Sequence, residues 1–396
     1  MSVQALRMPG SAFGRSHVHA VAGCYFVASF AALGLPPYLT EILPELGDRG
    51  ARWAGVLYVV PTVFGALGAP LWGRLADRFG RKRLLLRAQL GLAVAFLLAG
   101  WADSLATFTV ALVLQGILGG TFAASNGYLG AALEGVALSK ALTLMQGSAR
   151  AALVVAPIVV GSLSGWMSPQ RQYALLAVLP LTAALLLAAL PEPETVRQAE
   201  RKPVTASEET PTVSLNALYA LEFAFVFSTV ISFPYLIQLV EDRLPGTSPA
   251  LSGVLFALPH LCYLVTALKV HSVFQDRPRT GLALGFAGIA LGLAGHGIAG
   301  SLPALIAVRL LLGAGLTLGL VCLSVLAADC AKGRAPGGMF GSLEFFSKAG
   351  AVAAGVAAAA GSVRFGPAAP VLIGGAAAAL TATLLPTLHL RTRWSR

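Results

Sequence analysis

Residues 73–83 read Gly-Arg-Leu-Ala-Asp-Arg-Phe-Gly-Arg-Lys-Arg, and this stretch decides how the rest of the chain is interpreted. Two glycines, one acid and five bases fall within these eleven residues, between two long apolar runs. Such a composition predicts a short cationic turn between two hydrophobic helices. Because Lys and Arg gather in the cytoplasmic loops of membrane proteins, the stretch also predicts the side of a membrane on which this loop lies.

The composition of the whole chain favours a membrane protein. Of its 396 residues, 56% are apolar and only 11% are charged, and the mean hydropathy is +0.76. A soluble domain carries about 25% charged residues because its surface faces water. The net charge of +11 could attract nucleic acid, but the bases cluster between apolar runs instead of covering a polar face. We therefore expect a lipid bilayer, and no nucleic acid, as the partner.

Apolar runs of about 20 residues, the length that spans a bilayer, recur along the chain. They predict an all-α membrane protein with twelve transmembrane helices in two six-helix pseudo-symmetric bundles. The expected spans are 17–39, 52–73, 84–102, 105–127, 141–165, 172–190, 215–240, 250–270, 281–298, 303–327, 337–361 and 369–389. The expected domains are a cytoplasmic tail (1–16), the N-terminal bundle (17–190), a cytoplasmic linker (191–212), the C-terminal bundle (213–390) and a second cytoplasmic tail (391–396). The linker is rich in Pro, Glu and Thr, so it cannot bury a core.

The distribution of Lys and Arg predicts the orientation of these spans. With the N-terminus inside, the bases in outside segments are Arg49, Arg52, Arg171, Arg243 and Arg364. Three more lie within spans, and the remaining twenty of the 28 bases fall inside. This asymmetry predicts that both termini and the linker are cytoplasmic.

No catalytic or metal-binding motif occurs in the sequence. The cysteines (Cys24, Cys262, Cys322 and Cys330) show no C-x-x-C spacing, so we expect neither a disulfide framework nor a metal site. There is no nucleophile elbow, zinc-protease motif or phosphate-binding loop. The sequence therefore predicts that the protein is not an enzyme, has no cofactor and takes its energy from an ion gradient, most simply of protons.

The two halves of the chain carry similar residues at equivalent places. These are Asp77-Arg78 and Asp276-Arg277 after the second and eighth spans, Gln146 with Arg150 in the fifth span, and Glu344 with Lys348 in the eleventh. Such a repeat is typical of transporters that bind substrate between two parallel halves, near the bilayer midplane.

The loop pattern G-x-x-x-D-R-x-G-R-K, together with twelve spans and a long central linker, resembles the major facilitator superfamily of secondary transporters. Leu-Pro-Pro-Tyr (35–38) and Gly-Ala-Pro-Leu-Trp-Gly (68–73) look like its drug:proton antiporter, or efflux, branch. Two other motifs are degraded. The fourth span keeps Gln115 and Gly116 but has Leu112 in place of an arginine, and the fifth keeps Ala156-Pro157 and Gly161. These departures put a standard multidrug mechanism in doubt.

The resemblance implies how the protein closes. It predicts that Asp77 faces the start of the eleventh helix near Gly337 and latches the cytoplasmic side. The residues expected to take part in gating are Gly73, Asp77, Arg78, Gly80, Arg81, Asp276 and Arg277. In the alternative interpretation the bases only set the topology, and Asp77 neutralises Arg78 or Arg81.

Charged groups within the spans are the candidate functional residues, because an ionised side chain at bilayer depth needs a partner or a wet cavity. The resemblance implies that helices 1, 4, 7 and 10 line the cavity. The expected substrate-binding residues are Arg150, Gln146, Glu222, Gln115, Asn126, Lys348 and Tyr25, and the expected proton-coupling residues are Glu222, Glu344 and His260. The alternatives are structural: Glu222 could pair with a base, Glu344 with Lys348, and His260 could be a packing residue. For Arg309 a structural and a functional role are equally open.

These features together predict a monomeric secondary transporter of the bacterial cytoplasmic (inner) membrane. The leading hypothesis is proton-coupled export of a small polar or anionic metabolite, such as a siderophore, by alternating access. The alternatives are an importer of a siderophore or similar nutrient, a multidrug efflux protein, and a non-transporting receptor or scaffold.

Overall fold

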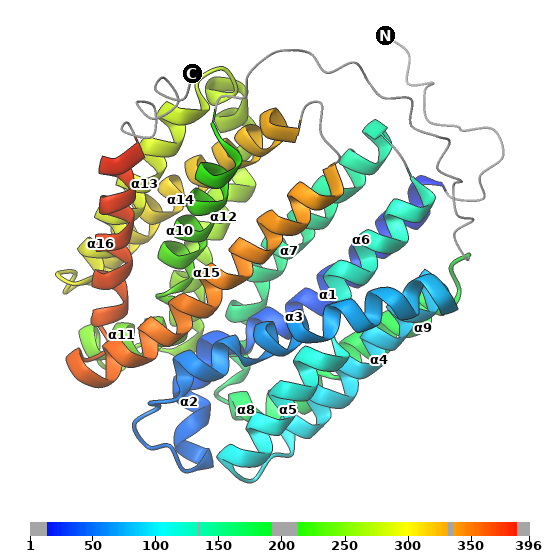
Figure 1. Cartoon of the computed structure of the whole chain (residues 1–396). Coiled ribbons are helices and arrows are strands. Elements are labelled where there is room, and N and C mark those ends of the chain that lie inside the picture. The colour runs from blue at the N-terminus through cyan, green and yellow to red at the C-terminus, as the bar shows by residue number, and fades with distance from the viewer. Residues whose placement is uncertain (1–13, 134, 192–212, 332–335, 386–396) are drawn as a thin grey trace.

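The computed structural model describes residues 14–133, 135–191, 213–331 and 336–385, and over these ranges every regular element is a helix (Figure 1). Side chains are described in these ranges except at some helical positions, among them Gly73, Asp77 and Asn126. The predicted linker and tails lie almost wholly outside the described residues.

The first half of the chain contains six membrane-crossing units, some of which consist of consecutive helices. They are α1 (Arg15–Gly34) with η1 (Pro36–Tyr38), α2 (Leu39–Ile42) and η2 (Leu43–Leu46); α3 (Ala54–Phe79); α4 (Arg81–Gly100); α5 (Leu105–Leu118) with α6 (Thr121–Ala132); α7 (Gly135–Leu163); and α8 (Pro169–Leu176) with α9 (Val178–Ala188).

The second half contains six further units. They are α10 (Leu215–Val230) with η3 (Phe233–Tyr235) and α11 (Leu236–Arg243); α12 (Pro249–Phe274); α13 (Pro278–His296); α14 (Leu302–Ala331); α15 (Pro336–Phe365); and α16 (Ala369–Leu384). The all-α fold with twelve membrane-crossing units confirms the prediction, and the observed helices overlap all of the expected spans.

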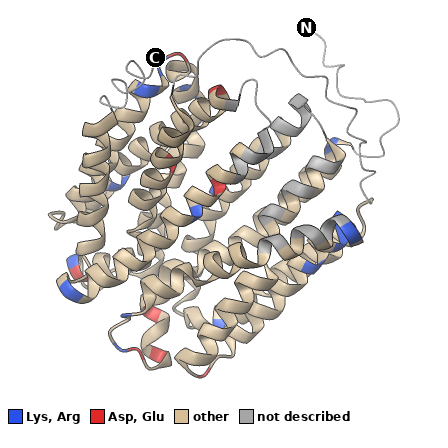
Figure 2. Cartoon of the chain, viewed as in Figure 1, with Lys and Arg blue, Asp and Glu red and all other residues tan. Residues whose placement is uncertain are grey.

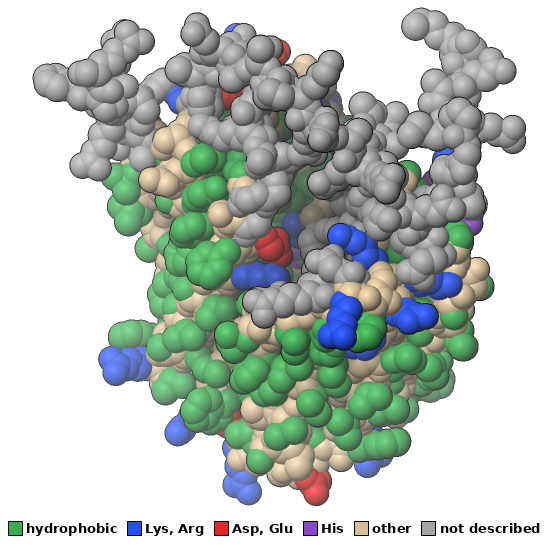
Figure 3. Space-filling view, turned by 45° about the vertical axis from the view of Figure 1, so that its right-hand side comes forward, with side chains coloured by type: hydrophobic (Ala, Val, Ile, Leu, Met, Phe, Trp, Pro, Cys, Tyr) green, Lys and Arg blue, Asp and Glu red, His purple; other side chains and the backbone are tan. Residues whose placement is uncertain are grey.

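The surface is suited to lipid. Eight helical segments of the described chain are long and apolar enough to cross a membrane. Large apolar side chains on them are exposed, including Leu185 (68% exposed), Val265 (74%) and Leu268 (87%). Figure 3 shows hydrophobic side chains over much of one face, with charged ones at its lower end and in a group at mid-height, below the grey atoms. In water such a surface would be unfavourable, so this is a multi-pass membrane protein.

The bundle has two distinct ends. The Gly80 end is where α3 passes to α4 through Gly80, and the Gly47 end is the opposite one, where η2 ends. In Figure 1 the units from α1 to α9 and those from α10 to α16 form two groups, which meet where α7 packs on α12 and α3 on α15.

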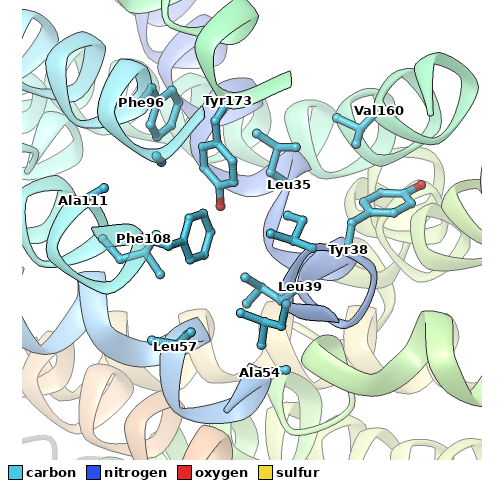
Figure 4. Close-up of a cluster of buried hydrophobic side chains, with 14 of the residues drawn as sticks. Leu35, Tyr38, Leu39, Ala54, Leu57, Phe96, Phe108, Ala111, Val160 and Tyr173 are labelled. Atoms are coloured by element: carbon cyan, nitrogen blue, oxygen red, sulfur yellow. The ribbon is translucent and has the colours of Figure 1, made fainter. Parts of the chain in front are cut away.

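A buried apolar cluster joins the two halves near the Gly47 end. It surrounds η1 and contains Leu35, Tyr38 and Leu39 from one half and Ile231 and Tyr235 from the other, all at most 1% exposed. Figure 4 shows part of this cluster, in which Tyr173 packs against Phe96 and Phe108 and lies beside Leu35. Because these side chains leave no room for water, the Gly47 end is closed in this structure.

The predicted loop at 73–83 is much shorter than expected. Helix α3 continues to Phe79 and α4 begins at Arg81, so the turn consists of Gly80 alone. Gly80 has φ +98°, a conformation that glycine adopts without the steric penalty of a Cβ. Arg and Asp are compatible with a helix, and their charges therefore did not mark the helix end. The prediction of a turn between two helices is confirmed, but its extent was wrong.

Candidate functional site

A cavity of about 760 Å³ lies between the two halves. Its walls come from α1 and α3 to α7 on one side and from α10, η3, α12 and α15 on the other, and it reaches from Arg81 at the start of α4 to Phe233 in η3. Cavities of this size hold drug-sized ligands. The first, fourth and seventh spans, which are α1, α5 with α6, and α10, line the cavity as the resemblance implied. No described residue of the tenth span, α14, lines it.

The inner end of the cavity is formed by aromatic rings, here termed the aromatic floor: Tyr58 from α3, Phe233 from η3 and Phe256 from α12. The centroids of Tyr58 and Phe233 are 6.2 Å apart and those of Phe233 and Phe256 are 4.9 Å apart, both in edge-to-face geometry. The floor offers apolar and π surface to a ligand from both halves of the protein.

Arg150 places a positive charge in the cavity wall, halfway along α7. Its guanidinium lies 5.7 Å from the ring centroid of Tyr263. It also interacts electrostatically with Tyr25 of α1 and with Glu222 of α10. The face of the Tyr263 ring stabilises the cation, and no carboxylate of the described residues forms an ion pair with it. Arg150 can therefore bind an anionic group of a ligand.

Glu344 and Lys348 lie one turn apart on α15 and both line the cavity. The Lys348 Nζ is 3.4 Å from Glu344 Oε1, and the side chains are 38% and 49% exposed, respectively. Figure 2 shows an acid and a base beside each other partway along α15, away from the charged ends of the bundle. Because a partly exposed ion pair contributes at most about 1 kcal/mol, either group can exchange its partner for a charged ligand.

Glu222 lies behind the cavity wall and is not among the lining residues. Its carboxylate interacts with the Ser347 side chain of α15. It also interacts electrostatically with Arg150 and with Glu344. Glu222 thus interacts with both charged parts of the cavity wall without lining the cavity itself.

His260 is fully buried in α12, with 1% exposure, and does not line the cavity. Its ring packs against Phe233 and Phe256, with centroid distances of 5.8 Å to each. Neither ring nitrogen has a hydrogen-bond partner among the described residues. The side chain stands directly behind the aromatic floor.

The buried side chain of Arg309 binds the backbone of α12. Pro259 has no N–H, so the Leu255 carbonyl one turn earlier in α12 lacks its helical donor. The Arg309 Nε donates to the Leu255 oxygen at 2.7 Å, and Nη2 donates to the Phe256 oxygen at 2.8 Å. Arg309 therefore supplies a donor to the Leu255 carbonyl in place of the N–H that Pro259 lacks, and a second donor to Phe256.

The fourth span is interrupted at Gly119–Gly120, which the sequence analysis did not anticipate. Gly120 has φ +85° and separates α5 from α6. Three carbonyl groups at the end of α5 accept hydrogen bonds from other helices. Trp72 Nε1 donates to Ile117 at 2.6 Å, and Arg87 donates to Leu118 at 2.9 Å and to Gly119 at 3.3 Å.

Arg87 also lies over the Trp72 ring, with its guanidinium carbon 3.5 Å from the centroid. A cation at a helix C-terminus is favourable because the carbonyl ends carry partial negative charge. Trp72, Arg87 and Gln115 all line the cavity, and Gln115 Oε1 is buried with no hydrogen-bond partner among the described residues. A planar cation, an indole and an amide thus meet at the cavity wall beside the break.

The remaining predicted ligand residues lie outside the cavity or outside the description. Tyr25 is buried in α1 and interacts with Ser29. Gln146 is exposed and does not line the cavity. The side chain of Asn126 is outside the described residues.

The predicted gating residues are only partly described. The side chain of Asp77 and the surroundings of Gly337 are not described. The expected latch between them therefore lies outside the described residues. Arg78 is exposed and lies over the Phe79 ring at 5.3 Å, while Asp276 and Arg277 are exposed in the turn between α12 and α13. Arg81 lines the cavity. Its neighbour Lys82 caps the end of α9, where its Nζ donates to the Ala188 carbonyl at 2.9 Å and to that of Leu190.

Known proteins resemble this chain in both sequence and fold. The sequence model described as "Major Facilitator Superfamily" matches residues 21–244. The multidrug resistance protein MdtG of Yersinia enterocolitica is 33% identical over 171 residues, which are 42% of this chain and 39% of MdtG. MdtG of Dickeya zeae is 26% identical over 260 residues, or 63% of each chain. The matches therefore cover about two fifths to just under two thirds of these relatives.

Solved structures share the fold across nearly the whole chain. The human organic anion transporter MFSD10 (TETRAN) is 20% identical, with a TM-score of 0.66 over 93% of this chain and 98% of that one. A POT family transporter in complex with 5-aminolevulinic acid is 11% identical, with a TM-score of 0.75 over 98% and 100%. A D-xylose–proton symporter is 14% identical, with a TM-score of 0.70 over 93% and 95%. The family model matches more than half of the chain and shows that the chain belongs to the major facilitator superfamily, and the solved structures show that it has the same fold.

Proposed function

We propose that this protein exports amphiphilic compounds that carry an anionic group across the bacterial inner membrane. The observation that carries this proposal is the cavity, which combines the cationic side chain of Arg150 with the aromatic floor. The relatives named as multidrug resistance proteins support efflux of several compounds. They give no support to a siderophore as substrate. Multidrug efflux, the alternative in the sequence analysis, is therefore the better hypothesis.

The charges of the cavity favour anions over cations. Among the described residues, the charged ones that line it are four bases, Arg81, Arg87, Arg150 and Lys348, and one acid, Glu344. A ligand can place its apolar or aromatic part on the floor and its negative group between Arg150 and Lys348. Lys348 can move from Glu344 to the ligand because the ion pair is weak and partly exposed.

A transport assay in cells tests this substrate class. Cells that express the protein are loaded with an aromatic carboxylate dye or with a lipophilic cationic dye of similar size, and the loss of dye is followed with and without a protonophore. We expect protonophore-sensitive loss of the carboxylate dye. The variant Arg150→Gln should reduce it at least tenfold, while Arg171→Gln, which removes an exposed arginine outside the cavity, should not.

Other results would contradict the proposal. Preferred loss of the cationic dye would overturn the substrate class, and gradient-driven accumulation of the carboxylate dye would identify an importer. Equal dye retention with and without the protein, for both dyes, would favour a receptor or scaffold.

We further propose that Glu222 couples transport to protons. It interacts with Ser347 of α15, with Arg150 and with Glu344, so a change in its charge alters the cavity wall. The variant Glu222→Gln keeps a hydrogen-bond acceptor for Ser347 but cannot ionise. We expect it to bind dye normally, to exchange dye across the membrane without a gradient, and to lose the response to a proton gradient. Glu45→Gln, at an exposed acid of the Gly47 end, serves as the control.

A further inference from the structure

Two short 3-10 helices occupy equivalent places in the two halves. They are η1 (Pro36–Tyr38), which follows α1, and η3 (Phe233–Tyr235), which follows α10. Each ends in Pro-Tyr. A short helix that begins with leucine, α2 or α11, follows directly. The two 3-10 helices pack against each other between the halves, and η3 contributes Phe233 to the aromatic floor. The repeat thus places two tyrosines at the closed Gly47 end.

Tyr38 bridges the seam between α7 and α12. Its side chain is completely buried. The hydroxyl donates to the carbonyl of Pro157 in α7 at 2.6 Å and lies 3.0 Å from the carbonyl of Pro249, the first residue of α12. One hydroxyl of the first half therefore meets carbonyl groups of both halves.

Two glycines make this contact possible. A Cβ at Gly161 of α7 would overlap the Pro249 carbonyl and the Tyr38 hydroxyl. A Cβ at Gly253 of α12 would overlap the Pro157 carbonyl. Each helix thus presents a glycine to a carbonyl of the other, and the backbones approach as closely as these residues allow.

Tyr235 bridges the second seam, between α3 and α15, in a corresponding way. It is 1% exposed, and its hydroxyl accepts a hydrogen bond from the Gly55 N–H at 3.2 Å and donates to the Arg52 carbonyl at 3.3 Å. A Cβ at Gly55 would overlap the carbonyl of Gly355 in α15, and a Cβ at Gly355 would meet the Gly55 carbonyl at 2.5 Å. Here a tyrosine of the second half binds the backbone of the first.

We propose that Tyr38 and Tyr235 are paired latches that hold the Gly47 end closed, and that both release when this end opens. The Tyr38 hydroxyl lies between a carbonyl of its own half and one of the other half, and the Tyr235 hydroxyl binds backbone groups of the other half. Each tyrosine is next to a pair of facing glycines. Hydrogen bonds to backbone groups at such seams can break and re-form when the halves rock, with no change in the core of either half. The inference rests on the proposed function only in assuming that the cavity becomes accessible from each end in turn.

Cysteine labelling tests the latches without requiring transport. In a background without the four native cysteines, Thr62→Cys places one thiol in the cavity wall. Glu45→Cys and Arg83→Cys, made separately at exposed positions near the two ends, identify which face of a vesicle carries the Gly47 end. A membrane-impermeant maleimide is then applied from each face, and the labelling rate of the cavity thiol is measured.

We expect Tyr38→Phe and Tyr235→Phe each to raise labelling from the Gly47 face about fivefold, the factor that corresponds to one net hydrogen bond. The double variant should exceed either single one, and labelling from the Gly80 face should fall. Tyr173→Phe is the matched control, because that buried tyrosine packs against Phe96 and Phe108 within one half.

Glycine variants provide a second measurement that keeps the tyrosines intact. Gly161→Ala should force the seam apart and raise labelling from the Gly47 face, whereas Gly147→Ala in the same helix meets no atom within 4 Å and should not. Unchanged labelling from the Gly47 face in the double tyrosine variant and in Gly161→Ala would overturn the proposal. Increased labelling in these variants, together with a native protein that transports neither dye, would uphold the latches and count against the proposed substrates alone.

Discussion

Replacement of Arg309 by methionine should destabilise the protein through α12, not through the cavity. Arg309 is the largest fully buried side chain in the described chain and donates two hydrogen bonds to α12 carbonyl groups. Hydrogen bonds from charged groups contribute about 1.5–3 kcal/mol each. Removal of a buried charge offsets part of this contribution, so the expected net loss in the free energy of unfolding is about 2–3 kcal/mol.

A double-mutant cycle with Pro259 isolates the cause. In Pro259→Ala the backbone N–H at position 259 can donate to the Leu255 carbonyl, as in an ordinary helix. The loss caused by Arg309→Met should then be about 1–2 kcal/mol smaller in the alanine background than in the native one. Unfolding of the four proteins in detergent, followed by the helical circular dichroism signal, measures this coupling. Arg171→Met, at an exposed arginine, should change stability little.

The cycle has a clear contrary outcome. Equal losses from Arg309→Met in both backgrounds would show that the free carbonyl of Leu255 is not what Arg309 stabilises. A variant that unfolds like the native protein but no longer moves dye would give Arg309 a functional role instead. Either result would refute the structural account of this arginine.

Three further predictions concern the interrupted span and the ion pair. Gly120→Ala should reduce the free energy of unfolding by about 1–2 kcal/mol because alanine is strained at positive φ, whereas Gly147→Ala should not; thermal unfolding distinguishes them. Arg87→Lys keeps the charge but loses the planar contact with several carbonyls, so we expect a lower melting temperature. An unchanged melting temperature would contradict this. Glu344→Gln should change the free energy of unfolding by less than about 1 kcal/mol. It should raise the preference for the anionic dye over the cationic dye several-fold, because Lys348 loses its competing partner. A shift toward the cationic dye would contradict this.

The positions of the spans could be predicted from the sequence because length and apolarity are sufficient to identify a membrane helix. Where the chain changes direction was harder to predict. The charges of 73–83 suggested a loop, but the turn depends on the positive φ of Gly80 alone. Gly119 and Gly120 gave the corresponding signal within the fourth span. It was missed because the apolar run continues through them.

The candidate site was less predictable because the sequence does not give the direction of a side chain. Arg150, Gln115, Glu344 and Lys348 reach the cavity wall, but the equally polar Gln146, one turn from Arg150, does not. The partners of Arg87 could not be found from sequence, since carbonyl groups are present at every residue. The repeated Pro-Tyr-Leu, in contrast, was visible in the sequence and marks both proposed latches.

The most direct test of the account is dye flux in vesicles reconstituted with the purified protein. A proton gradient is imposed in either direction, and movement of the aromatic carboxylate dye is compared for the native protein, Arg150→Gln and the exposed-site control Arg171→Gln. The account predicts flux that reverses with the gradient, stops with a protonophore and falls at least tenfold in Arg150→Gln only. Flux that ignores the gradient, or that is the same in all three proteins, would contradict a proton-coupled path through this cavity.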